Sequence, residues 1–172
     1  IKKAILAAAA QFKKLGIKIT PVSLPHSHYG IAAYYLIAPT ETCSNLSRYD
    51  GVRYGQDRSY FGAEAKRRIM LGAFAASAGY ASRYYNKAAK VRTLIIQDFT
   101  QVFQKVDAIL APVAPMPPFK LGEKTSNPLE MYLADVYAAP ASLSGLPSLA
   151  LPCGFTQAMQ LYAMSTGSPL QG

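Results

Sequence analysis

The segment that constrains the fold most is a long apolar stripe in the middle of the chain, followed at once by a short apolar run. Seven residues recur at intervals of three and four: Tyr84, Ala88, Val91, Ile95, Phe99, Val102 and Val106. This spacing predicts one amphipathic helix of about 26 residues. Asp107–Pro112 is apolar after its first residue and ends in proline, which predicts a buried strand. A helix leading into a buried strand is typical of an α/β domain.

Other segments repeat these two patterns. Lys2–Leu15 has apolar residues at helical spacing and is followed by Gly16, a favourable residue just beyond a helix end. Ile17–Val22 alternates apolar and polar residues, which predicts a short strand. Leu146–Gly154 carries prolines near both ends of an apolar run, which predicts a second, fully buried strand. The expected fold is therefore α/β, a mixed sheet covered by helices.

Further helices are predicted between these strands. Tyr29 to about Leu46 forms one helical run, and Phe61–Gly72 forms another between two glycines. The Asp50-Gly51 dipeptide predicts a turn between them. A loop over residues 122–128 leads to a helix that starts near Leu129.

Composition and charge restrict the class of protein. The chain has 172 residues, 51% of them hydrophobic, and contains no apolar run near the roughly 20 residues that span a bilayer. Its net charge is +9, with +5 in residues 1–60, +6 in residues 61–106 and −2 in residues 107–172. This asymmetry fits either an RNA-facing surface or solvated helix faces. Cys43 and Cys153 are far apart and predict reduced thiols of a cytoplasmic type. Because the chain begins with Ile rather than Met, we expect an excerpt of a longer protein.

Arg68 has two interpretations. If Ile69, Leu71 and Phe74 face a core, Arg68 lies at its edge, where a guanidinium needs an anionic partner. That partner is either an acidic side chain, which makes a structural ion pair, or a substrate carboxylate held by two parallel hydrogen bonds.

The familiar catalytic motifs are missing from the sequence. It contains no Gly-x-Ser-x-Gly elbow, P-loop, Gly-x-Gly-x-x-Gly or His-Glu-x-x-His segment. His26 and His28 lie two residues apart in a turn, but no third metal ligand is evident nearby, so we expect no metal site. Ser142, Ser144 and Ser148 are expected at turns or helix ends.

Five segments, taken in order, carry a resemblance to a known family: Tyr34–Pro39, Ser44–Gly55, Phe61–Gly72, Lys90–Ile95 and Pro128–Asp135. Together they resemble the A subunits of glutamyl-tRNA(Gln) amidotransferases, a branch of the amidase signature family. The resemblance extends from residue 1 to about residue 155. The Ser-Asn-Leu-Ser-Arg-Tyr-Asp-Gly and Phe-Gly-x-Glu-x-Lys-Arg-Arg-Ile sequences are specific to this branch.

The resemblance implies an activity for the whole enzyme. Such subunits hydrolyse glutamine with a Ser–cis-Ser–Lys triad and pass ammonia to an activated glutamyl-tRNA on the B subunit, where ATP and Mg are used. A C subunit completes the complex, which meets tRNA through its B subunit and acts in the bacterial cytoplasm or an organelle. None of the triad residues can be placed on this chain, because the family carries them further upstream. Residues 1–172 are thus expected to be the middle-to-C-terminal part of one amidase domain, inactive alone and without a cofactor of its own.

The resemblance also assigns glutamine-binding residues. The family's substrate tyrosine falls on Tyr34, with Tyr35 beside it, its carboxylate-binding arginine on Arg68, and its amine-binding aspartate on Asp135. Free glutamine presents an α-carboxylate, an α-ammonium and a reacting amide, and these side chains suit such groups. The structural alternatives are a core aromatic for Tyr34 and an ion pair on the side of a helix for Asp135.

The sequence departs from the family in two places, and two rival functions stay open. The link from Tyr54 to Phe61 is short, and residues 156–162 match the family's strand loosely, which leaves the pairing of that strand open. One rival is a general amidase of the same fold that acts on a simpler amide. The other is a basic, non-catalytic module that binds RNA or assists assembly.

Overall fold

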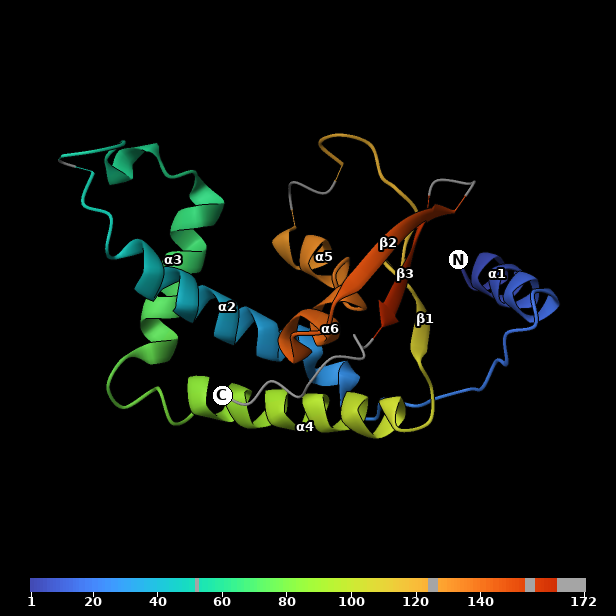
Figure 1. The fold of residues 1–172 in the computed structure, drawn as a ribbon. Helices are drawn as coiled ribbons and strands as arrows, with labels where there is room; N and C mark the ends of the chain where they lie inside the picture. Colours follow the sequence, from blue (N-terminus) through green and yellow to red (C-terminus); the bar gives the residue numbers. More distant parts are fainter. Residues whose placement is uncertain (52, 124–126, 154–156, 164–172) are drawn as a thin grey trace. The chain divides into compact units, whose positions relative to one another are not determined.

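The computed structural model describes residues 1–51, 53–123, 127–153 and 157–163 (Figure 1). The chain divides into two compact units, one made of residues 1–31 with 94–172 and the other of residues 32–93. Helices α2 and α4 each continue from one unit into the other.

The sheet of the first unit has three strands in the order β1-β3-β2. They are β1 (Ala108–Pro112), β2 (Ser148–Cys153) and β3 (Gln157–Ala163). Both pairings are antiparallel, so the parallel pair that a mixed sheet requires does not occur among the described strands. The strands predicted at 107–112 and 146–154 are confirmed, and the segment after residue 155 supplies the central strand.

Strand β2 differs from its prediction in burial. Leu149 is 54% exposed, and its neighbours Ser148 and Ala150 are exposed too. The expectation of a fully buried strand is therefore wrong for these residues. Edge position does not explain this exposure, because β1 is an edge strand too and its Ile109 is buried. The physical reason is that a strand is buried only where other elements cover its faces, and the side chains of residues 148–150 are left uncovered.

Helix α1 (Lys2–Lys14) ends as its sequence predicts. Gly16 has a φ of +86°, and its N–H donates to the Lys13 carbonyl while the Ile17 N–H donates to the Phe12 carbonyl, both at 3.1 Å. This pair of bonds is the Schellman arrangement, which satisfies carbonyls that a helix end leaves unpaired.

The strand predicted at Ile17–Val22 is wrong. These residues have no regular secondary structure and belong to no sheet among the described residues, and Ile17, Ile19 and Val22 are 40–48% exposed. Alternation of apolar and polar residues indicates which face a strand would bury, but it provides no neighbouring strand to pair with. Pro21 also lacks the N–H that a ladder needs.

Helix α4 (Tyr85–Phe103) carries the apolar core of the first unit. Ile95, Phe99 and Val102 of the predicted stripe are buried, which confirms the face that the spacing indicated. The helix has 19 residues and is shorter than predicted, because the Lys105 and Val106 N–H groups both donate to the Val102 carbonyl in a turn that leads to β1.

The rest of the first unit consists of short helices. They are η1 (Ser27–Tyr29), α5 (Pro128–Leu133) and α6 (Ala138–Ser144). Asn127 caps α5, since its side-chain oxygen accepts the Leu129 N–H at 3.1 Å. The helix predicted to start near Leu129 is confirmed.

The second unit is built on α2 (Gly30–Leu46) and α3 (Ala63–Ala76), with η2 (Arg58–Tyr60) between them. Both longer helices were predicted. They approach so closely at Gly72 that a Cβ there would lie 2.1 Å from the Pro39 carbonyl oxygen. Glycine at this position allows the two backbones to touch.

Helix length and composition bear on the membrane question. Among the described residues, no helix combines the length and the apolar character needed to cross a bilayer.

Candidate functional site

Arg68 lies on α3, one turn from an acidic residue at the start of the same helix. Its Nε donates to Glu64 Oε1 at 2.9 Å, and Arg67 also pairs with Glu64. The Arg68 side chain is 38% exposed and that of Glu64 45% exposed. Ion pairs on an exposed helix surface contribute at most about 1 kcal/mol. The Arg68–Glu64 pair therefore contributes little to the stability of α3.

The face of Arg68 is covered by an aromatic ring from α2. Its guanidinium carbon lies 5.4 Å from the centroid of the Tyr35 ring, and Tyr35 is 9% exposed. A cation within about 6 Å of a ring face is attracted to it, which favours the position of the guanidinium over the Tyr35 ring. Arg68 is thus held by an acid along its own helix and by a buried ring on the neighbouring helix.

Tyr34 lies beside Tyr35 and is half-buried. The two rings meet edge to face, with centroids 5.2 Å apart. The residue that contacts Arg68 is therefore Tyr35, whereas the resemblance assigned the substrate role to Tyr34. The sequence signal for this contact was a spacing of four residues. Tyr35 and Pro39 lie on one face of α2, because residues four apart share a helix face. Arg68 and Gly72 lie on one face of α3 in the same way, and these two faces are in contact.

Asp135 lies in the turn between α5 and α6 and is exposed. The structural alternative, an ion pair on the side of a helix, does not describe it: its backbone carbonyl accepts the N–H groups of Ala138 and Ala139, at 3.0 and 2.9 Å, and so begins α6. Within the described residues its carboxylate makes no hydrogen bond or ion pair. A carboxylate in this state is available to an ammonium ligand.

The three predicted residues belong to different units. Tyr34 and Arg68 are in residues 32–93, and Asp135 is in the unit that contains residues 94–172. Their convergence on one ligand stays a prediction.

Two pockets lie in the second unit. One, of about 660 Å³, includes Thr40, Cys43 and Gly72, and the other, of about 280 Å³, includes Cys43 and Ile69. Neither Tyr34 nor Arg68 lines them. Both are lined by residues from the C-terminal half of α2 and from α3, together with residues outside these two helices.

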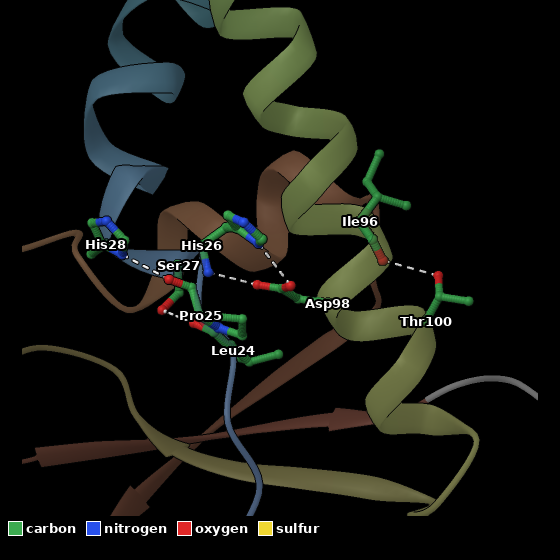
Figure 2. Close-up of polar contacts among 8 residues, drawn as sticks. All are labelled: Leu24, Pro25, His26, Ser27, His28, Ile96, Asp98 and Thr100. Atoms are coloured by element: carbon green, nitrogen blue, oxygen red, sulfur yellow. Dashed lines mark hydrogen bonds and ion pairs between the residues drawn. The ribbon is translucent and has the colours of Figure 1, made fainter.

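The two histidines have structural partners (Figure 2). His28 Nδ1 lies 2.8 Å from the Pro25 carbonyl oxygen, and His26 is bonded to the buried Asp98. The described residues contain no group of three or more possible metal ligands. Asp98 was not anticipated, because an acidic residue in a long amphipathic helix is ordinarily solvated.

The described serine hydroxyls near α6 are bonded within the helix. Ser142 Oγ donates to the Ala138 carbonyl at 3.2 Å, and Ser144 Oγ donates to the Pro140 carbonyl at 2.7 Å. These bonds are typical of serines in helices and agree with the structural role expected for both residues.

Comparison with known proteins gives a consistent result. A model of the amidase family matches residues 1–170. The chain is 53% identical over 173 residues to the A subunit of glutamyl-tRNA(Gln) amidotransferase from Myxococcus xanthus, in a match that covers 92% of the chain and 36% of that protein. It thus spans about a third of the length of such relatives.

Solved structures agree on the fold. The crystal structure of the A subunit of glutamyl-tRNA(Gln) amidotransferase from Thermotoga maritima is 37% identical, with a TM-score of 0.68 over 94% of the chain and 34% of that structure. An allophanate hydrolase from Kluyveromyces lactis is 21% identical with a TM-score of 0.72, over 94% of the chain and 26% of its own. This second likeness shows the shared fold alone and confirms an incomplete α/β domain of the amidase type.

Proposed function

The chain belongs to the amidase family, and from that premise we propose that it forms part of a protein that hydrolyses glutamine and supplies the ammonia for converting Glu-tRNA(Gln) to Gln-tRNA(Gln). The observation that carries the proposal is the difference in identity between two kinds of relative. Identity is 53% to an amidotransferase A subunit, against 21% to an allophanate hydrolase of the same fold.

The proposed role of this part of the protein is to bind glutamine. Arg68 pairs with the α-carboxylate, Asp135 with the α-ammonium, and Tyr34 orients the side chain. The support for Arg68 is its restrained guanidinium, whose present partner is a half-exposed carboxylate. The support for Asp135 is an exposed carboxylate on a turn that its own backbone carbonyl organises.

The reacting groups are proposed to lie elsewhere in the protein. We assign residues 1–172 to the middle and C-terminal part of one amidase domain. The serine nucleophile, its partner serine and the lysine come from outside this part, so the chain by itself hydrolyses no glutamine. The B and C subunits are the proposed partners, and ATP, Mg and tRNA are used at the B subunit.

The test measures glutamine hydrolysis by the full-length protein with its partner subunits. Arg68→Ala and Asp135→Ala should each raise KM for glutamine by about 10- to 100-fold, because each removes one charged hydrogen bond to substrate. Hydrolysis of a simple amide such as propanamide, which carries neither charge, should be unaffected.

A matched control is available on the same helix. Arg67 also pairs with Glu64 and is exposed, so Arg67→Ala removes a neighbouring cation without removing the proposed ligand. Its KM for glutamine should stay within about twofold of the parent value. Equal losses for Arg67→Ala and Arg68→Ala would mean that general positive charge, rather than a specific clamp, attracts the substrate.

A further inference from the structure

The buried acid of the first unit holds a turn 72 residues away in the sequence. Asp98 is 6% exposed; its Oδ2 accepts the backbone N–H of His26 at 2.7 Å, and its Oδ1 lies 2.9 Å from His26 Nδ1. Figure 2 shows both carboxylate oxygens directed from α4 to this one residue. Two bonds from one rigid carboxylate fix the position of the His26 backbone as well as its ring.

The turn held in this way leads directly into α2 and against α6. The Tyr29 N–H donates to the His26 carbonyl at 3.1 Å, and the next residue, Gly30, begins α2. A Cβ on Gly30 would lie 2.8 Å from Cγ and 3.1 Å from Cδ of Pro140, which is buried. The start of α2 is therefore in close contact with the first turn of α6.

The same turn of α6 is bonded to the proposed ammonium-binding residue. Pro140 follows Ala138 and Ala139, whose N–H groups both donate to the Asp135 carbonyl. A series of contacts thus joins Asp98 to Asp135. Asp98 bonds to His26, whose turn leads to Gly30, and Gly30 lies against α6, which begins with bonds to the Asp135 carbonyl. All of these residues belong to one unit.

We propose that Asp98 and His26 are positioning residues that hold Asp135 where its carboxylate binds the α-ammonium of glutamine. This proposal rests on the proposed function. Neither residue touches the substrate, and each acts through the contact of Gly30 with Pro140. If these contacts are weakened, the turn that contains Asp135 can move. Displacement of a binding group by about 1 Å lowers the rate of reaction by up to about 100-fold.

The experiment compares glutamine with glutaramate, which is glutamine without its α-amino group. The ratio of kcat/KM for the two amides, measured on the full-length protein with its partner subunits, reports how well the ammonium is bound. Asp135→Ala should abolish the preference for glutamine. His26→Ala and Asp98→Asn should lower the preference for glutamine over glutaramate by about 10-fold, because KM for glutamine rises while kcat is unchanged. Glutaramate hydrolysis should be unaffected.

His28→Ala is the matched control, because the His28 ring contacts its own turn, with a hydrogen bond to the Pro25 carbonyl and packing against the adjacent Tyr29 ring, and has no bond to Asp98. It should keep the full preference. Asp98→Asn retains an acceptor for the His26 N–H, so its preference should exceed that of Asp98→Ala. If Asp98→Ala does not fold, Gly30→Ala replaces it, since its Cβ would overlap Pro140 while both partners of the His26–Asp98 bonds are kept.

The outcomes separate the two proposals. If Asp135→Ala abolishes the preference while His26→Ala and Gly30→Ala retain it, the positioning role is wrong and the binding role of Asp135 stands. If Asp135→Ala keeps the preference for glutamine, Asp135 does not bind the ammonium, and the positioning role of Asp98 and His26 is wrong as well. A fall in kcat for both amides in His26→Ala would indicate general structural damage and would also overturn the positioning role.

Discussion

Replacing Gly72 by alanine tests the packing that presents Arg68. A Cβ at this position would lie 2.1 Å from the Pro39 oxygen, 2.4 Å from its carbonyl carbon and 2.8 Å from the Thr40 nitrogen, where ordinary contact begins at 3.4 Å. All three atoms are backbone, so no side-chain rotation relieves the overlap and α3 has to move away from α2.

Two opposing terms set the size of the effect. Alanine in a helix interior is more favourable than glycine by about 1 kcal/mol. Overpacking of a rigid contact costs about 1–3 kcal/mol and occasionally more. Because the overlap at Gly72 is with backbone, we take the upper end of that range and expect a net loss of about 2 kcal/mol in the free energy of unfolding.

The assay is urea unfolding of the full-length protein followed by circular dichroism, with amide hydrogen exchange to locate the change in α2 and α3. Gly62→Ala is the matched control, since a Cβ there meets no atom within 4 Å. It should change stability by less than about 1 kcal/mol. Arg68 lies one turn before Gly72, so Gly72→Ala should also raise KM for glutamine as the guanidinium leaves the Tyr35 ring. A Gly72→Ala protein as stable as the parent, or more stable, would refute the close approach of the two helices.

Two further results are expected. Asn127→Ala removes the side-chain cap of α5 and should lower the free energy of unfolding by about 1 kcal/mol. Asn127→Asp keeps a capping oxygen and should lower it less. Equal losses for the two variants in urea unfolding would exclude the cap as the cause. The Ser59 hydroxyl and backbone N–H both bond to Asp57 and lower the pKa of its carboxyl. Its contribution to stability is therefore present above the ordinary carboxyl pKa and is lost as the pH falls through the lower value in the folded protein. An NMR titration of Asp57 with an ordinary midpoint would contradict this.

The helices and two of the strands could be predicted because their signals are local. The apolar stripe from Ala88 to Val102 indicates which face of α4 is buried, and Gly16 indicates where α1 ends. The same kind of signal failed for Ile17–Val22, since a strand also needs a neighbour that no local pattern provides.

The candidate site was harder to predict because its contacts join distant segments. Arg68 was expected to need an anion, and Glu64 four residues earlier is that partner, yet the Tyr35 ring comes from another helix. Asp98 has the sequence context of a solvated helix residue but lies buried against His26. The role of Asp98 depends on how α4 packs against the turn before α2. The spacing of residues along either segment does not indicate this packing.

The central claim is that Arg68 and Asp135 bind opposite ends of the same amino acid backbone. Its most direct test is the hydrolysis of three amides by the parent, Arg68→Ala and Asp135→Ala proteins: glutamine, glutaramate without the amino group, and 4-aminobutanamide without the carboxylate. We predict that Arg68→Ala lowers kcat/KM for glutamine and glutaramate but not for 4-aminobutanamide. Asp135→Ala should lower it for glutamine and 4-aminobutanamide but not for glutaramate. Losses that do not depend on which charged group the substrate carries would contradict the claim.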